Sequence, residues 1–143
     1  MTSNSMKNVV VFGTFDFLHI GHIFFLREAK RLGDELTVCV ARDSIIKDLK
    51  GKLPIHTEKE RAEIMAELNI VDKVILGDRV IGRYAILRSL EPDIVAVGYD
   101  QQDLQKSLDK HIRLHNLNIK VSKIENYGGQ KVKSSDIKKR LEI

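Results

Sequence analysis

The segment 9–22, VVVFGTFDFLHIGH, constrains the fold most, because an apolar run meets a glycine and then two histidines. Three valines and a phenylalanine in a row predict a central parallel strand that is buried on both faces. Gly13 ends the run and allows positive φ or the close approach of a ligand. His19 and His22 are three residues apart at the start of a predicted helix, so they face the same side. Free N–H groups and the positive end of the helix dipole predict a phosphate site there, with Gly21 between the imidazoles.

The rest of the chain predicts strands and helices in alternation. Thr57 followed by Glu60 is a capping-box pattern that opens a helix, and Gly33 is expected to end the first helix as a glycine stop. This alternation predicts an α/β fold, a Rossmann-like doubly wound five-stranded parallel sheet with helices on both faces. The length of 143 residues suits one domain, 1–143. We expect strands over 8–13, 35–41, 72–76, 93–97 and 119–124, and helices over 20–32, 57–68, 81–90, 101–116 and 135–141.

Composition excludes several classes of protein. A single cysteine, Cys39, excludes an internal disulfide framework and a multi-cysteine zinc site, and its apolar surroundings predict a buried thiol. No apolar stretch approaches the ~18 residues that span a membrane, and the polar N-terminus lacks a signal-peptide core. We therefore expect a cytoplasmic protein without a membrane partner. The net charge of +4 suits an anionic small molecule better than nucleic acid, because few aromatic residues accompany the lysines.

Ligands of doubly wound sheets bind beyond the carboxyl ends of the strands. The patterns GxGxxG and GxxxxGK[ST] are absent after the first strand, which argues against a dehydrogenase or a P-loop kinase. After the second strand, Lys47, Lys50 and Lys52 are expected on a basic loop that could neutralise a triphosphate or could simply be solvated. After the fourth strand, Gly98 would let a base or ribose approach and Asp100 could accept its hydrogen bonds, although a plain turn is the alternative.

The segments Gly13-Thr14-Phe15-Asp16 and His19-Ile20-Gly21-His22 together resemble the HxGH signature of the nucleotidyltransferase superfamily, the cytidylyltransferase-like group. The resemblance implies transfer of a nucleoside monophosphate from an NTP to a small phosphorylated acceptor, with release of pyrophosphate. It implies that His19 and His22 are catalytic and stabilise the transition state. It also implies Mg²⁺ or another divalent metal, held mainly by the triphosphate, and no metal-ligating residue is assigned.

The resemblance further implies a set of nucleotide-binding residues. Asp16 matches an acid near the acceptor or the metal, and could equally be a turn residue. Arg61 matches an arginine that holds the loop or the phosphates, and an exposed helix ion pair is the alternative. The C-terminal serine pair could also be a simple helix cap, and the arginine usual before it is missing from 127–130. The full set is Gly13, Thr14, Phe15, Asp16, Gly21, Lys50, Lys52, Arg61, Gly98, Asp100, Lys133, Ser134 and Ser135.

Four further stretches, 40–43, 50–54, 71–77 and 91–95, are most similar to the archaeal-type FAD synthetases, which adenylylate FMN from ATP. Glycerol-3-phosphate cytidylyltransferases and the heptose-phosphate adenylyltransferases of lipopolysaccharide core synthesis share the first motif, so CTP stays open beside ATP. A non-catalytic nucleotide-binding regulator would bind a nucleotide without turnover, and a nucleic-acid binder would show strongly salt-dependent affinity. Relatives are frequently homodimers, so we expect a homodimer.

Overall fold

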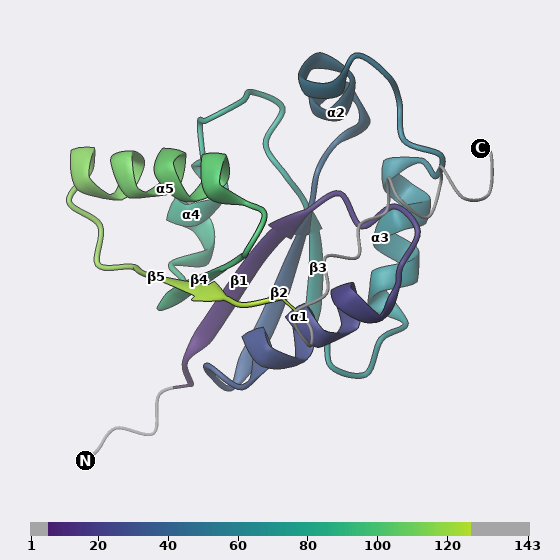
Figure 1. Cartoon of the computed structure of the whole chain (residues 1–143). Helices are drawn as coiled ribbons and strands as arrows, with labels where there is room; N and C mark the ends of the chain where they lie inside the picture. The colour runs from purple at the N-terminus through teal and green to yellow at the C-terminus, as the bar shows by residue number, and fades with distance from the viewer. Residues whose placement is uncertain (1–5, 127–143) are drawn as a thin grey trace.

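The structure, a computed structural model, describes residues 6–126. Its strands form one parallel sheet in the order β3-β2-β1-β4-β5, and the helices lie on both sides of it (Figure 1). This order confirms the predicted doubly wound, Rossmann-like α/β fold. The expected helix 135–141 lies outside the described residues. The strands are β1 (Asn8–Gly13), β2 (Glu35–Val40), β3 (Lys73–Leu76), β4 (Ile94–Gly98) and β5 (Lys120–Ile124).

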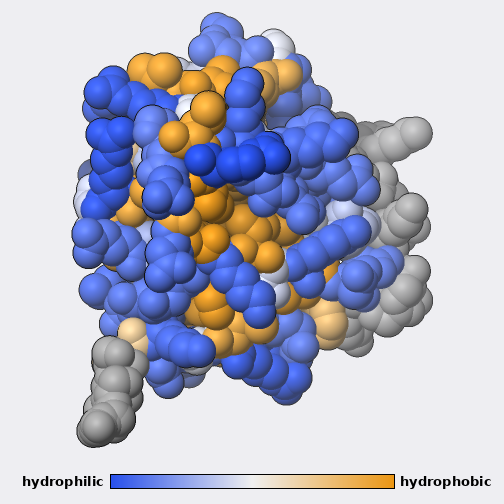
Figure 2. Space-filling view, turned by 90° about the vertical axis from the view of Figure 1, so that its left-hand side faces the viewer, coloured by the Kyte–Doolittle hydropathy of each residue, from blue (hydrophilic) through white to orange (hydrophobic). Residues whose placement is uncertain are grey.

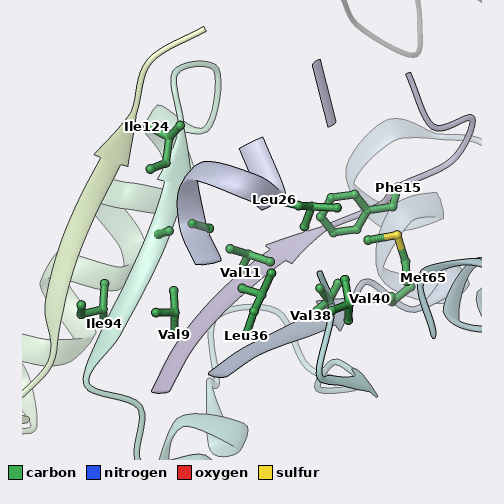
Figure 3. Close-up of a cluster of buried hydrophobic side chains, with 13 residues drawn as sticks. Val9, Val11, Phe15, Leu26, Leu36, Val38, Val40, Met65, Ile94 and Ile124 are labelled. Atoms are coloured by element: carbon green, nitrogen blue, oxygen red, sulfur yellow. The ribbon is translucent and has the colours of Figure 1, made fainter. Parts of the chain in front are cut away.

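Two helices cover each face of the sheet. Successive side chains of a strand point to opposite faces, so each buried strand supplies both layers of the core. On one face, α1 (Ile20–Lys30) and α3 (Glu58–Ala66) pack over β1 and β2 (Figure 3). On the other face, α4 (Ala85–Leu90) and α5 (Gln102–Leu114) cover Val10, Val95 and Val97. The first layer includes Val9, Val11, Leu26, Leu36, Val38, Val40 and Met65.

The edge strand β5 lies beside α5 on the left of Figure 1. Figure 2 looks onto this side, where hydrophobic side chains reach the surface among hydrophilic ones. Within residues 6–126, no helix has the length and apolar character that a membrane crossing would need.

One helix occupies a segment that we expected to be a basic loop. Residues Asp43–Lys50 form α2, which buries Ile46 and ends at Gly51 with φ 77°, a left-handed cap that glycine adopts without strain. Lys47 and Lys50 are therefore exposed residues of a helix, and only Lys52 lies beyond it. The loop prediction was wrong because it followed the lysines and overlooked the apolar spacing among them.

Two helix boundaries also differ from the prediction. The helix α1 ends at Lys30 and its C-cap residue Arg31 has a right-handed backbone, so Gly33 is not its stop. A Cβ on Gly33 would lie 2.8 Å from the carbonyl oxygen of Lys7, so this glycine is needed for close packing instead. The helix α4 begins at 85 rather than 81, because Gly82 and Tyr84 have left-handed backbones with φ of 76° and 49°.

Two local predictions are confirmed. Thr57 is the N-cap of α3, where its hydroxyl accepts from the N–H of Glu60 at 3.2 Å and the Glu60 carboxylate accepts from the N–H of Thr57 at 2.9 Å. Cys39 is a buried thiol at 2% exposure, and burial together with nearby Asp78 raises its pKa to about 12.

Candidate active site

The loop after β1 is held in a strained conformation by its own aromatic residues. Phe15 and Phe17 have φ of 53° and 57°, a region that side-chain-bearing residues rarely adopt. The Phe15 ring turns back into the core, where it is 5% exposed. A Cβ on Gly13 would lie 2.6 Å from this ring, so the ring itself explains the glycine. The ring fixes the course of the loop from the end of β1 to the start of α1.

The two histidines form the N-terminal cap of α1. His19 is the N-cap, and its Nδ1 accepts the N–H of Gly21 at 3.1 Å. The Nδ1 of His22 accepts the N–H of His19 at 3.3 Å, which completes a capping box made of two imidazoles. The rings stack with centroids 3.9 Å apart and an angle of 24° between their planes. The structure thus brings both predicted catalytic residues together at the carboxyl end of the sheet.

These hydrogen bonds decide where each imidazole carries its proton. Because both Nδ1 atoms accept, the neutral ring of each histidine carries its hydrogen on Nε2. The Nε2 of His19 is buried and has no hydrogen-bond partner among residues 6–126. A buried donor without a partner is costly, so this atom is suited to a ligand acceptor.

Both histidines have lowered pKa values. Burial, followed by the neighbouring His19, lowers the pKa of His22 to about 4. Burial also lowers the pKa of His19, and the carboxylate of Asp100 opposes this effect. Both pKa values therefore lie below the reference value of about 6.5 for histidine. At neutral pH the pair presents neutral N–H donors.

Arg61 connects the loops around this site. Its side chain is completely buried, which excludes the exposed ion pair considered as the alternative. Its Nη1 donates to the carbonyl of Thr14 at 2.8 Å and its Nε to the carbonyl of His56 at 3.0 Å. Its Nη2 donates to Asp43 Oδ1 at 2.7 Å. One guanidinium therefore ties the loop after β1 to the segments that begin α2 and α3. A contact of Arg61 with the phosphates stays a prediction.

Asp16 makes a second connection of the same kind. Its carboxylate is 2% exposed and accepts the N–H groups of Ile55 at 2.8 Å and His56 at 3.0 Å. These bonds fix the chain before α3 against the loop after β1, so the acid has a clear positional role. The direct ligand role expected for Asp16 stays a prediction.

At the end of β4, Gly98 is buried, and the exposed Asp100 folds back over it. A Cβ on Gly98 would lie 3.2 Å from Asp100 Oδ1. The carboxylate of Asp100 acts on the pKa of His19, and the nucleotide-binding role expected for Gly98 and Asp100 stays a prediction. Gln101 was missed: its amide donates to the carbonyl of Phe12 at 2.8 Å and accepts the N–H of Gly98 at 2.9 Å. No local sequence signal indicates a partner 89 positions away.

The remaining predicted contacts are less well placed. Lys50 and Lys52 are exposed and form no ion pair with another described residue. Lys133, Ser134 and Ser135 lie outside the described residues. No group of three or more His, Cys, Asp or Glu side chains within 6–126 is arranged to hold a metal ion.

Comparison with known proteins agrees with this geometry. Residues 10–140 match the cytidylyltransferase-like family. The FAD synthase of Thermococcus sibiricus is 42% identical over 124 residues, which cover 87% of this chain and 84% of that protein. The FAD synthase of Thermoplasma volcanium is 40% identical over 136 residues, 95% of this chain and 94% of that one.

A solved structure shows the same arrangement. It is described as the lipopolysaccharide core biosynthesis protein from Thermoplasma volcanium GSS1, and it is 40% identical with a TM-score of 0.80. The match covers 86% of this chain and 99% of that chain. With the family match and relatives similar over nearly their whole length, the predicted resemblance is confirmed: the chain belongs to the cytidylyltransferase-like family.

Proposed function

We propose that this protein transfers AMP from ATP to FMN, which forms FAD and releases pyrophosphate. The observation that carries the proposal is the stacked pair His19 and His22, whose Nδ1 atoms accept from the backbone. The buried Nε2–H of His19 has no hydrogen-bond partner within residues 6–126 and is left for a ligand. The similarity to archaeal FAD synthases over most of the chain supports FMN as the acceptor.

In the proposed reaction, an oxygen of the FMN phosphate forms a bond to the α-phosphorus of ATP. The bond from the α-phosphorus to its bridging oxygen breaks, and pyrophosphate leaves with the electron pair. Charge develops on the phosphoryl oxygens during this step, and neutral N–H donors aimed at them stabilise it. His19 and His22 supply these donors at the positive end of α1. Because the protein groups are already in place, little reorganisation is needed.

A divalent cation, Mg²⁺ or another, fits this chemistry as a partner of the triphosphate. Mg²⁺ usually keeps several waters and binds through substrate phosphates with one or two carboxylates. Within residues 6–126 no group of three or more ligating side chains is arranged for a metal ion, and the proposal assigns the ion mainly to the triphosphate.

Further nucleotide contacts belong to the same proposal. The backbone of the loop after β1 and the loop after β4 would hold the adenosine moiety. The exposed lysines at the end of α2 and the C-terminal lysine and serines would hold the triphosphate. The residues proposed are Gly13, Thr14, Phe15, Asp16, Gly21, Lys50, Lys52, Gly98, Asp100, Lys133, Ser134 and Ser135, with Arg61 positioning the loop.

The test crosses two nucleotides with three acceptors. Purified protein with Mg²⁺ is given ATP or CTP together with FMN, glycerol-3-phosphate or a heptose phosphate, and pyrophosphate release and product mass are measured. We expect turnover with ATP and FMN and a product of the mass of FAD. Turnover only with another acceptor, or nucleotide binding without any turnover, contradicts the proposal and favours a sugar-phosphate enzyme or a regulator respectively.

A heptose phosphate is the second candidate acceptor, because the solved structure with the same fold is described as a lipopolysaccharide core biosynthesis protein. We also propose a homodimer. Hydrophobic side chains at the surface beside β5 support this state, and sedimentation velocity measures it (Figure 2).

A further inference from the structure

The sheet divides at the carboxyl ends of its central strands. The pairing of β1 with β4 stops at Val11 and Ala96. Beyond this point β1 stays paired with β2 as far as Gly13, while β4 stays paired with β5 as far as Gly98. The two halves of the sheet therefore separate in front of the candidate site. The loops that leave β1 and β4 lie on either side of this division, and we call them the two walls of the candidate site.

The side chain of Gln101 bridges this division. It accepts from the N–H of Gly98 at 2.9 Å and donates to the carbonyl of Phe12 at 2.8 Å. The amide thus stands where the next backbone hydrogen bonds between β1 and β4 would have formed. One side chain is thus hydrogen-bonded to both strands at their carboxyl ends.

Gln101 stands directly before α5, where a side chain would be expected to bond to the helix rather than to the sheet. It is the N-cap residue of α5, where side chains commonly accept a hydrogen bond from the first turn of their own helix. Gln101 makes no such bond and points toward the sheet instead. The Gln101 side chain therefore bonds the two strands and does not cap α5.

We propose that Gln101 is a positioning residue that fixes the loop after β4 against the loop after β1, and so sets the width of the nucleotide site. The proposal rests on the proposed function, since both loops are expected to contact the nucleotide. The two hydrogen bonds of Gln101 hold the end of β4 at Gly98 beside the end of β1 at Phe12, and the carboxylate of Asp100 lies next to Gly98. Both walls touch the nucleotide before and during the reaction, so a change in their separation alters binding more than the chemical step.

The test replaces Gln101→Met, which keeps the length of the side chain and removes both hydrogen bonds. We expect the KM for ATP to rise about tenfold or more, the kcat to stay within about threefold and the KM for FMN to change by less than about twofold. A purely structural role would lower the thermal midpoint and the fraction of active protein, and so the kcat, without moving the KM for ATP. A KM for ATP within about twofold of the unmodified protein overturns the proposal, whatever the thermal midpoint.

Gln102 provides the matched control, because it is the next residue in the same helix, is exposed and has no side-chain hydrogen bond within the described residues. Gln102→Met is expected to leave all three constants unchanged. If Gln101→Met does not fold, the KM for ATP is measured in Gln101→Glu instead. This variant keeps the acceptor for the N–H of Gly98 and loses the donor to the carbonyl of Phe12. Calorimetric binding of α,β-methylene-ATP separates this proposal from the choice of substrate: we expect the same loss of affinity even if FMN is not the acceptor, and unchanged affinity overturns it.

Discussion

Replacing Arg61 by methionine tests whether one buried guanidinium holds the active-site loops together. The side chain is completely buried and donates to Thr14, His56 and Asp43. Methionine preserves most of the apolar stem but leaves two carbonyls and a carboxylate without their donor. Hydrogen bonds to charged groups contribute about 1.5–3 kcal/mol each, and breaking a buried ion pair costs about 3–5 kcal/mol. The Arg61–Asp43 contact is both a hydrogen bond and an ion pair, so the two ranges overlap and are not added. Because Asp43 keeps 27% of its side-chain surface in solvent and regains water, we expect a total loss within the range of about 3–5 kcal/mol.

The expected loss for Arg61→Met is about 4 kcal/mol in the free energy of unfolding. A domain of this kind has about 5–15 kcal/mol in total, so the variant should be close to unfolding at moderate temperature. Urea unfolding followed by circular dichroism measures the difference. Arg31→Met is the control, because the Arg31 side chain is 69% exposed and its ion pair with Glu28 should contribute under about 1 kcal/mol. A loss below about 1 kcal/mol for Arg61→Met would refute the bridging role.

Three further predictions concern the histidine pair and the glycine before it. His19→Ala or His22→Ala should lower kcat about 100-fold or more with a modest change in ATP affinity. Equal losses of kcat and of ATP affinity would show that the histidines bind the ground state of the substrate. The pKa of His22 is about 4 in the folded protein and about 6.5 when unfolded, so the unfolded state binds more protons between these values. The free energy of unfolding should therefore fall as pH drops from about 6.5 to about 4. The urea midpoint of His22→Asn should fall less over this range than that of the unmodified protein. Parallel pH profiles for the two proteins would contradict the lowered pKa of His22. Gly13→Ala places a methyl 2.6 Å from the Phe15 ring and should cost about 1–3 kcal/mol, and a thermal midpoint equal to that of the unmodified protein would show that the ring moves freely.

The sequence predicted the fold and the histidine pair because both depend on local patterns. The apolar run of β1, the glycine after it and the spacing of His19 and His22 lie within one short segment. Alternating strands and helices then leave few topologies, and the observed strand order is among those expected. The capping pattern at Thr57 is likewise read within four residues.

The contacts that hold the loops together depend on distant partners, and these could not be predicted from local patterns. Arg61 lies 47 positions from Thr14 and Gln101 lies 89 from Phe12, so neither partner is visible in the neighbouring sequence. The lowered pKa of His22 depends on burial, which a motif does not reveal. By contrast, α2 could have been predicted, since Ile46 and Leu49 are spaced for one helix face, but the lysines at 47, 50 and 52 led us to expect a loop.

The most direct measurement of the central claim uses ATP labelled with phosphorus-32 at the α-phosphate, incubated with the protein, FMN and Mg²⁺. The proposed reaction breaks the bond between the α- and β-phosphates, so the account predicts label in FAD and unlabelled pyrophosphate. It also predicts that the label transferred to FAD falls about 100-fold or more in the His22→Ala variant. Absence of labelled FAD, with ATP still bound, would contradict adenylyl transfer to FMN at this site.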